Sequence, residues 1–467
     1  MSDAVVIVGG GLAGLAAAAG LATQGVRSIL LESRPRLGGR ASSFEDAGTG
    51  EFVDNCQHVA MGCCTAFLHF CEQTGLAPFF RPAEALHFVG PDGRTHRFAA
   101  GRWPAPLHLA GAFAGLSYFG WQDRLAIARG LKALAAPANR EDRGETFAAW
   151  LARQRQPATV VRRFWEVVLV SALSESLDRI SVPGARKVFV DSFLAHRDGW
   201  RVEIPTVPLD DLYSGPLTQW LTGHGVDVRV AAGVQQVAVG TEHALAVTLR
   251  SGEVLTADDV VVAVPWHRVL DLVPKEIAAE PALRAAAELE AAPITSVHLW
   301  FDRPVTDLPH AVFVDRLVQW VFHRERPAEG ALPGSWYCQA VISASRVLAG
   351  QSQLEILKQV RAELAAVWPA VAEAQLLHSR QVTEKRAVFS PLPGSDALRP
   401  VQQTSLSGLQ LAGDWTRTGW PATMEGAVRS GYLAAENILR RRGLPARLLP
   451  PDLPVSWLSR LLFGLSK

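Results

Sequence analysis

The chain has 467 residues, of which 48% are hydrophobic and 19% are charged, and its formal net charge is +1. This composition excludes a largely disordered protein, and the near-neutral charge gives no electrostatic footprint for nucleic acid. The length exceeds one ordinary hydrophobic core, so we expect two domains.

The first forty residues have the pattern of a strand, a glycine-rich turn, a helix and a second strand. Residues 4–8 form an unbroken apolar run, residues 9–14 read Gly-Gly-Gly-Leu-Ala-Gly, a helical pattern ends near Gly25, and residues 28–31 precede Glu32. This order predicts a βαβ dinucleotide-binding unit, because glycines permit the tight turn, the approach of a pyrophosphate and close helix packing. The pyrophosphate would bind amides at the helix N-terminus, and Glu32 would accept a ribose hydroxyl. No basic flank or cleavage site precedes the strand, so we expect a cytoplasmic protein.

A second glycine pair follows within residues 34–41, which read Arg-Pro-Arg-Leu-Gly-Gly-Arg-Ala. It offers further amides and a cation to the same pyrophosphate, which a simple NAD dehydrogenase does not need. With this element the sequence resembles the flavoprotein family of amine oxidases, carotenoid desaturases and their relatives. The resemblance implies FAD as the cofactor. It also implies an α/β fold, in which a Rossmann-like FAD-binding domain of the glutathione-reductase type accompanies a discontinuous α+β substrate domain.

Four of the five cysteines crowd residues 56–71, beside Asp54 and His58. The paired Cys-x-x-Cys spacing of a zinc site is absent, so we predict buried packing cysteines, a helix over about 62–75, and no metal. The resemblance places residues 55–58 beside the flavin ring. Asp54-Asn-Cys-Gln-His58 is similar to an Asp-Asn-Gly-Gln-His element of the hydroxysqualene dehydroxylases, FAD enzymes of squalene and hopanoid biosynthesis, with a cysteine replacing the glycine.

A charge-free stretch over residues 103–122 has about the length that spans a bilayer. It contains two prolines, a histidine and several glycines, and it lacks the Leu/Ile/Val density of a spanning helix. We therefore expect a buried or membrane-dipping loop.

Later segments are predicted to return to the FAD domain. Strand-like runs occupy residues 226–239 and 258–265, and a short apolar run at 409–412 precedes a helix that opens at Met424. The resemblance implies an FAD-binding domain from residues 1–75, 206–285 and 400–445, a substrate domain from 76–205 and 286–399, and a tail over 446–467. The residues expected to contact FAD are Gly9, Gly11, Leu12, Ala13, Gly14, Glu32, Ser33, Gly38, Gly39, Arg40, Ala41, Gln57, His58, Val234, Gly413, Asp414, Met424 and Glu425.

The resemblance implies reductive dehydroxylation of a C30 isoprenoid, hydroxysqualene, to squalene. His58 is the expected acid or proton relay for the leaving hydroxyl, with Asp54 orienting it. The residues expected to contact substrate are aromatic: Phe164, Trp165, Trp415 and Trp420. Three alternatives remain open, namely a carotenoid- or phytoene-type desaturase, an amine oxidase, and a non-catalytic prenyl-lipid carrier. The electron donor is not specified.

The tail places Trp457, Leu458, Leu461, Leu462 and Leu465 on one helical face, flanked by Arg460 and Lys467. This pattern fits a helix lying on a membrane surface, and it equally fits a helix docked on the core. With a lipid substrate, we expect peripheral association with the inner face of the cell membrane.

Overall fold

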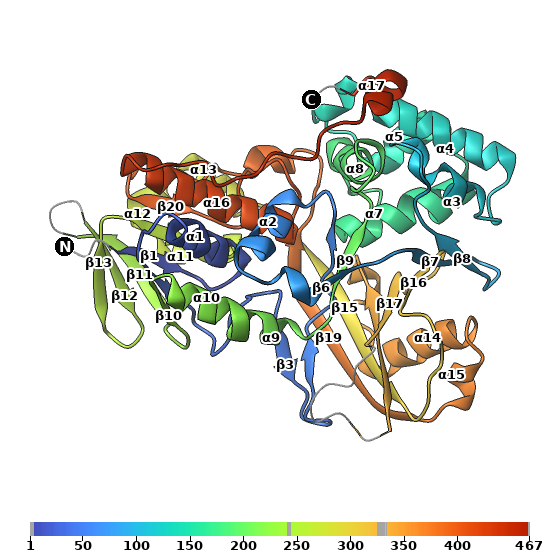
Figure 1. Ribbon diagram of the computed structural model, residues 1–467, viewed down its shortest axis with the longest axis horizontal. Helices are drawn as coiled ribbons and strands as arrows, with labels where there is room; N and C mark the ends of the chain where they lie inside the picture. Colours follow the sequence, from blue (N-terminus) through green and yellow to red (C-terminus); the bar gives the residue numbers. More distant parts are fainter. Residues whose placement is uncertain (1–3, 241–243, 325–331, 333, 466–467) are drawn as a thin grey trace.

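A computed structural model describes residues 4–240, 244–324, 332 and 334–465 and contains two main sheets with a separate group of helices (Figure 1). The first sheet is parallel, with strand order β10-β2-β1-β14-β20. Its strands are β1 (Val5–Val8), β2 (Ser28–Leu31), β10 (Val226–Arg229), β14 (Val260–Val262) and β20 (Leu409–Leu411). All four side chains of β1 are buried, as the unbroken apolar run requires.

Side chains alternate across β1 and enter two different cores. Val5 and Ile7 pack against helices on one face, whereas Val6 and Val8 pack against a small sheet and helices on the other. The first face is covered by α1 (Leu12–Ala22), α2 (Thr65–Gln73), α9 (Leu209–Leu212), α10 (Thr218–Gly223) and α16 (Met424–Arg441). The second is covered by β11 (Val234–Val239), β12 (Leu245–Leu249), β13 (Val254–Ala257), α11 (Trp266–Leu272), α12 (Lys275–Ala278) and α13 (Pro281–Ala286).

The second sheet has seven strands in the order β19-β15-β18-β17-β16-β7-β8 and is antiparallel except where β16 pairs with β7. Its strands are β7 (Leu86–Val89), β8 (Thr95–Phe98), β15 (Ala291–Phe301), β16 (His310–Phe313), β17 (Trp320–His323), β18 (Trp336–Ile342) and β19 (Leu376–Phe389). One face packs its aliphatic side chains against α14 (Gln353–Ala365) and α15 (Ala370–Glu373). The other face meets the hairpin formed by β3 (Ser43–Glu45) and β4 (Phe52–Asp54).

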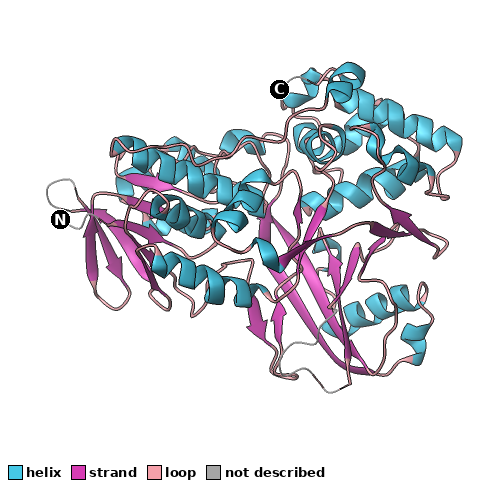
Figure 2. Cartoon of the chain, in the orientation of Figure 1, coloured by secondary structure: helices cyan, strands magenta, loops and turns pink. Residues whose placement is uncertain are grey.

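The helices between β8 and β9 form a group of their own beside the seven-stranded sheet (Figure 2). They are α3 (Ala110–Ala114), α4 (Trp121–Leu134), α5 (Phe147–Arg153), α6 (Ala158–Val160), α7 (Glu166–Leu173) and α8 (Val182–Phe189). Two π-helical turns interrupt them, η4 (Val161–Trp165) and η5 (Val190–Leu194), and a third, η6 (Tyr213–Leu217), follows α9. A three-stranded sheet of β5 (Ala60–Met61), β9 (Val202–Pro205) and β6 (Phe80–Pro82) joins this group to the segment that contains α2.

The C-terminal helix α17 (Trp457–Phe463) lies on the helical group. Leu465 is buried there, and Ser459 donates a hydrogen bond to the carbonyl of Leu194. Trp457 and Leu461 nevertheless remain exposed. Lys467, expected to flank this helix, lies outside the described residues. Within the described part of the chain, none of the helices combines the length and the apolar character needed to cross a bilayer.

Candidate cofactor and active site

The turn between β1 and α1 accepts only glycine at two of its positions. Gly9 has a φ of +111°, and a Cβ built on it would lie 2.5 Å from the carbonyl oxygen of Ala263. A Cβ on Gly14 would lie 1.9 Å from the carbonyl oxygen of Gly9. A side chain at either place would push the helix away from the strand, so the close packing of α1 on β1 depends on these glycines.

The N-terminus of α1 is left available to a ligand. The first intrahelical bond runs from the amide of Leu15 to the carbonyl of Gly11, so the amides of Leu12, Ala13 and Gly14 precede the helical ladder. Gly11 provides no side-chain cap, and no acidic residue stands in the first turn. Around a Cβ built on Gly11, only the Cα of Gly39 lies within 4 Å, at 3.9 Å. Free amides and a positive helix end with space beside them suit a diphosphate.

The second glycine pair folds directly over the first. The amide of Gly38 donates to the carbonyl of Gly10 at 2.8 Å. Gly39 has a φ of +64°, and a Cβ on it would lie 3.1 Å from the Cα of Gly11. The amide of Ala41 then donates to the carbonyl of Gly38 and closes the turn. Both glycine segments therefore present backbone to the same small region.

Glu32 follows β2 at its carboxyl end and fixes the neighbouring loops. Its carboxylate accepts the amide of Gly10 at 2.8 Å and the hydroxyl of Ser33 at 3.1 Å. Its carbonyl accepts the amide of Ala232 at 2.8 Å, two residues before the start of β11 at Val234. Val234 itself is buried in the core below this loop. These contacts gather three of the predicted cofactor segments at one edge of the parallel sheet.

The C-terminal segment joins the same region through a short ion pair. Arg40 donates to the carboxylate of Asp414 at 2.6 Å and to the carbonyl of Ala387 at 2.8 Å. The amide of Gly413 donates to the hydroxyl of Ser430 within α16 at 2.8 Å. Polypeptide segments more than 370 residues apart thus meet where the sequence predicts one ligand.

Glu425 has its carboxylate occupied by the protein. The fully buried side chain accepts the amides of Ala66 and Phe67, at 3.1 and 2.8 Å, and an Arg429 N–H at 3.1 Å. Burial raises the pKa of this carboxyl, while the two amides and Arg429 oppose that change. Glu425 therefore caps α2 and ties it to the start of α16, next to Met424. A contact of its backbone with cofactor stays a prediction.

Asp54 ends β4 and lies almost completely buried. Its Oδ1 accepts the hydroxyl of Ser43 at 2.6 Å and the amide of Leu209 at 2.9 Å. Burial raises the pKa of this carboxyl from 3.8 to about 6, although Ser43, Leu209 and Arg324 all favour the anion. In the described part of the chain no hydrogen bond joins Asp54 to His58, which the sequence analysis expected it to orient.

His58 is held as a neutral ring. Its Nδ1 contacts the carbonyl of Cys56 at 2.7 Å, which fixes the proton on that nitrogen and leaves Nε2 as an acceptor. Burial lowers the pKa of His58, and the positive charge of Arg40 lowers it further. Burial raises the pKa of the Cys56 thiol to about 11, so that group is neutral as well. Gln57, between them, is partly exposed. The predicted flavin-side loop therefore carries no charge over residues 56–58.

The seven-stranded sheet adds a polar cluster that the sequence analysis missed. Trp300 donates to the carboxylate of Glu51 at 2.8 Å, and Arg324 contacts that carboxylate at 3.4 Å. The Arg324 guanidinium also lies 4.7 Å from the ring centre of Tyr337, whose hydroxyl is 2.7 Å from Nδ1 of His298. Burial lowers the pKa of His298 to about 3. This cluster packs against the hairpin that carries Asp54.

The four aromatic residues predicted to contact substrate have different environments. Trp165 is fully buried and donates to Gln156 at 3.0 Å, and Trp415 is fully buried and donates to the carbonyl of Val264 at 2.9 Å. Phe164 is partly exposed, and its ring stacks on that of Phe189. Lys187 lies 4.2 Å above the ring of Trp420, which is 7% exposed. The two fully buried indoles, Trp165 and Trp415, pack in hydrophobic cores. Contact of each of the four residues with substrate stays a prediction.

Three of the four clustered cysteines lie in the core. Cys63, Cys64 and Cys71 are buried, Cys56 is partly exposed, and all are free thiols. Over the residues described by the structure, no three His, Cys, Asp or Glu side chains converge in the manner of a metal site. The helix α2 begins three residues later and ends two residues earlier than the sequence pattern indicated.

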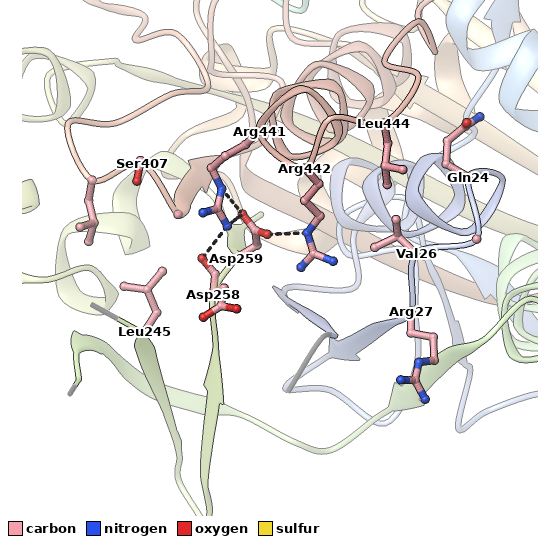
Figure 3. A pocket seen from close by; sticks show the side chains of 13 residues that line it. Gln24, Val26, Arg27, Leu245, Asp258, Asp259, Ser407, Arg441, Arg442 and Leu444 are labelled. Atoms are coloured by element: carbon pink, nitrogen blue, oxygen red, sulfur yellow. Dashed lines mark hydrogen bonds and ion pairs between the residues drawn. The ribbon is translucent and has the colours of Figure 1, made fainter. Parts of the chain in front are cut away.

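A polar pocket with a volume of about 830 Å³ lies at the opposite edge of the parallel sheet (Figure 3). Its lining includes Asp258 and Asp259, which precede β14, and the end of α16. The fully buried Asp259 contacts Arg442 at 2.8 Å and also pairs with Arg441 (Figure 3). Cofactors bind at the carboxyl ends of such strands, whereas this pocket is at the amino ends. The ion pairs of Asp259 connect the end of α16 to the start of β14.

Comparisons with known proteins agree with this geometry. A family model described as flavin containing amine oxidoreductase matches residues 12–439. A 15-cis-phytoene desaturase from Narcissus pseudonarcissus is 27% identical, over 93% of this chain and 79% of its own. A hydroxysqualene dehydroxylase from Sinorhizobium fredii is 28% identical, over 93% of this chain and 98% of its own. The cyclohexylamine oxidase structure from Brevibacterium oxydans superposes with a TM-score of 0.68 at 17% identity, covering 95% of this chain and 100% of that one. The predicted fold and the FAD cofactor are confirmed.

Proposed function

Because the chain belongs to the family of flavin-containing amine oxidoreductases and uses FAD, we propose that it converts hydroxysqualene to squalene by reductive dehydroxylation. In this proposal the backbone around Gly11 and Gly39 holds the diphosphate, and Glu32 holds the ribose. The ion pair of Arg40 and Asp414 lies between the diphosphate and the flavin. The hydroxysqualene dehydroxylase from Sinorhizobium fredii, almost all of whose length is covered, supports this choice of substrate.

The observation that carries the proposal is the buried carboxyl of Asp54, whose raised pKa keeps part of it protonated near neutral pH. Removal of a hydroxyl group needs a proton donor, because hydroxide is a poor leaving group. Asp54 is buried beside the loop of residues 55–58, and burial raises its pKa to about 6. Its Oδ1 accepts both hydrogen bonds from the protein, so the carboxyl can carry the proton on Oδ2.

We assign the proton transfer to Asp54 rather than to His58. A neutral His58, with its proton on Nδ1 toward Cys56, has only an acceptor at Nε2. The substrate C–O bond breaks as its oxygen takes the Asp54 proton, and the hydroxyl leaves as water. When bound and reduced, FAD would supply the hydride for the new C–H bond. Neutral groups at Cys56 and His58 provide no anionic nucleophile to trap an allylic cation.

A phytoene-type desaturase is the second candidate, and one observation favours it. The phytoene desaturase from Narcissus pseudonarcissus is nearly as similar to this chain as the dehydroxylase is. Desaturation removes hydrogen from a polyene and has no hydroxyl leaving group, so it gives no role to a carboxylic acid with a raised pKa at Asp54. FAD-dependent family membership favours an oxidoreductase over the non-catalytic lipid carrier.

The test uses the holoenzyme under anaerobic conditions. Protein whose flavin has been reduced with dithionite is mixed with hydroxysqualene in detergent, and squalene is detected by mass spectrometry. The matched control is Asp54→Asn, which keeps an acceptor for Ser43 and Leu209 but carries no acidic proton. Formation of squalene by the wild type alone supports the proposal. Unchanged hydroxysqualene, together with desaturation of phytoene by the oxidised enzyme and a quinone, would establish the second candidate instead.

The proposed location follows from the substrate. A C30 isoprenoid dissolves in bilayers and not in water, so we propose that the enzyme works at the cytoplasmic face of the cell membrane. Exposed tryptophan side chains occur in α17 and in the segment around α3 and α4, and these two surfaces are the candidates for that contact.

A further inference from the structure

Four large apolar side chains stand out into solvent around α3 and α4. Trp103 and Trp121 are 69% and 71% exposed, and Leu107 and Leu125 are 41% and 49% exposed. We call these four residues the α3–α4 surface. Such exposed tryptophans are costly in water and are typical of surfaces that contact a partner or a membrane.

The segment that carries the α3–α4 surface is well anchored. Leu109, Leu116 and Phe119 are buried in the core of the helical group. Arg124 donates to the carbonyls of Ala114 and Leu116, at 2.8 and 3.0 Å, and so ties α4 to the turn after α3. The exposure of the tryptophans is therefore a feature of a packed structure.

The charge around this surface is strongly biased. Residues 92–132 contain six basic side chains and two acidic ones, Asp123 and Asp92, which pairs with Arg94, in a chain whose total net charge is only +1. Arg102 and Arg129 are exposed within it. Arginine and lysine beside exposed tryptophan and leucine match an anionic lipid surface, where the cations meet phosphates and the apolar side chains enter the interface.

Aromatic rings pack behind α3 in the core of the helical group. Phe113 of α3 contacts Phe164 with ring centres 5.8 Å apart, and Phe164 stacks on Phe189 at 5.4 Å. Phe189 contacts Phe193, and the adjacent Ser192 lies 3.4 Å from Sγ of Cys63. Phe164 and Phe193 come from the π-helical turns η4 and η5, a local geometry often found at functional sites.

We propose that the α3–α4 surface docks on an anionic bilayer. The docking rests on the exposed side chains and the charge, and it stands independently of the proposed function. Docking places Trp103 and Trp121 at the lipid headgroups, with Arg102 and Arg129 against lipid phosphates.

The tail helix α17 provides a matched control within the same chain. Trp457 and Leu461 are 67% and 72% exposed, similar to the tryptophans of the α3–α4 surface. Helix α17 packs near Leu131 and Ala135, at the C-terminal end of α4, whereas Trp121 begins that helix. At 1.5 Å per residue the two ends of α4 are about 20 Å apart, so the two exposed surfaces can be altered separately.

The experiment measures cosedimentation of the FAD-loaded full chain with vesicles of equal parts phosphatidylglycerol and phosphatidylcholine. Trp103→Ser/Trp121→Ser is expected to lower the partition coefficient at least about tenfold, and Trp457→Ser/Leu461→Ser to leave it unchanged. Arg102→Gln/Arg129→Gln should weaken binding to these vesicles and reduce its salt dependence, with no effect on pure phosphatidylcholine vesicles. Flavin absorbance and circular dichroism verify that each variant is folded.

The proposal would be overturned if Trp457→Ser/Leu461→Ser lost vesicle binding while Trp103→Ser/Trp121→Ser kept it. It would also be overturned if the wild-type chain did not bind the vesicles. Turnover of hydroxysqualene in detergent separates docking from catalysis. Trp103→Ser/Trp121→Ser should keep that turnover, since neither altered residue lies at the proposed site. Vesicle binding without any turnover would remove the proposed function and leave the docking surface standing.

Discussion

Replacement of Asp54 by asparagine is expected to slow turnover and at the same time to stabilise the protein above pH 6. The carboxyl has a pKa of about 6 in the folded chain because of burial, compared with an ordinary value of 3.8. Between these two values the folded chain holds the proton and the unfolded chain does not. Stability therefore falls as pH rises through this window, and the loss is complete once the folded-state group has ionised.

The size of the effect follows from the difference between the two pKa values. That difference corresponds to about 3 kcal/mol. The amide of the Asp54→Asn variant would not titrate, and its side-chain oxygen can still accept from Ser43 and Leu209. The variant should therefore gain up to about 3 kcal/mol over the wild type between pH 4 and pH 8. Urea unfolding of the holoenzyme at these pH values measures the change.

The activity of the same variant should move the opposite way. Loss of a general acid lowers rates by roughly 100-fold or more, and the wild-type rate should fall about tenfold per pH unit above pH 6. Squalene formation at pH 5.5 and 7.5 tests both points. A variant that is as active as the wild type, or one whose relative stability does not change with pH, would show that Asp54 is not the acid described here.

Three further substitutions test other parts of the structure. Gly14→Ala places a Cβ 1.9 Å from the carbonyl oxygen of Gly9 and should yield protein without flavin absorbance. The control Gly111→Ala, whose Cβ would have no atom outside its own helix within 4 Å, should bind flavin normally. Equal flavin content in the two variants would contradict the close packing of α1 on β1. Arg40→Ala removes the 2.6 Å contact with Asp414 and should weaken FAD binding to the apoprotein roughly tenfold by fluorescence titration, and an unchanged Kd would exclude this role. Asp259→Asn removes the fully buried carboxylate that pairs with Arg441 and Arg442. The free energy of unfolding, measured with urea, should fall by about 3 kcal/mol while turnover is retained. An unchanged free energy of unfolding would show that these ion pairs do not stabilise the fold.

The nucleotide-binding half of the site could be predicted because its signals are local. Gly14 packs against the carbonyl of Gly9 in the same turn, and the apolar run of β1 indicates a strand buried on both faces. The packing of Cys71 follows from its position on a helix with apolar neighbours. Such features need only a few residues of context, and the domain boundaries, which need more, stay a prediction.

The acid–base side of the site could not be predicted because its contacts are distant in sequence. Asp54 receives an amide from Leu209, and Glu425 caps a helix that begins at Thr65. In β15, His298 alternates with apolar neighbours, a pattern that indicates a solvent-facing side chain. The structure instead buries it against the β3–β4 hairpin, and no local pattern contains that information.

The order of the strands has a consequence for how a long substrate is exchanged. The chain passes from the parallel sheet to the seven-stranded sheet, returns with β10 and β14, leaves again with β15, and comes back with β20. Four separate connections therefore hold the two halves, and a clamshell motion would have to bend all of them together. We expect loading and release to occur by small rearrangements among the helices between β8 and β9, while the cofactor half and the large sheet keep a fixed distance throughout the catalytic cycle.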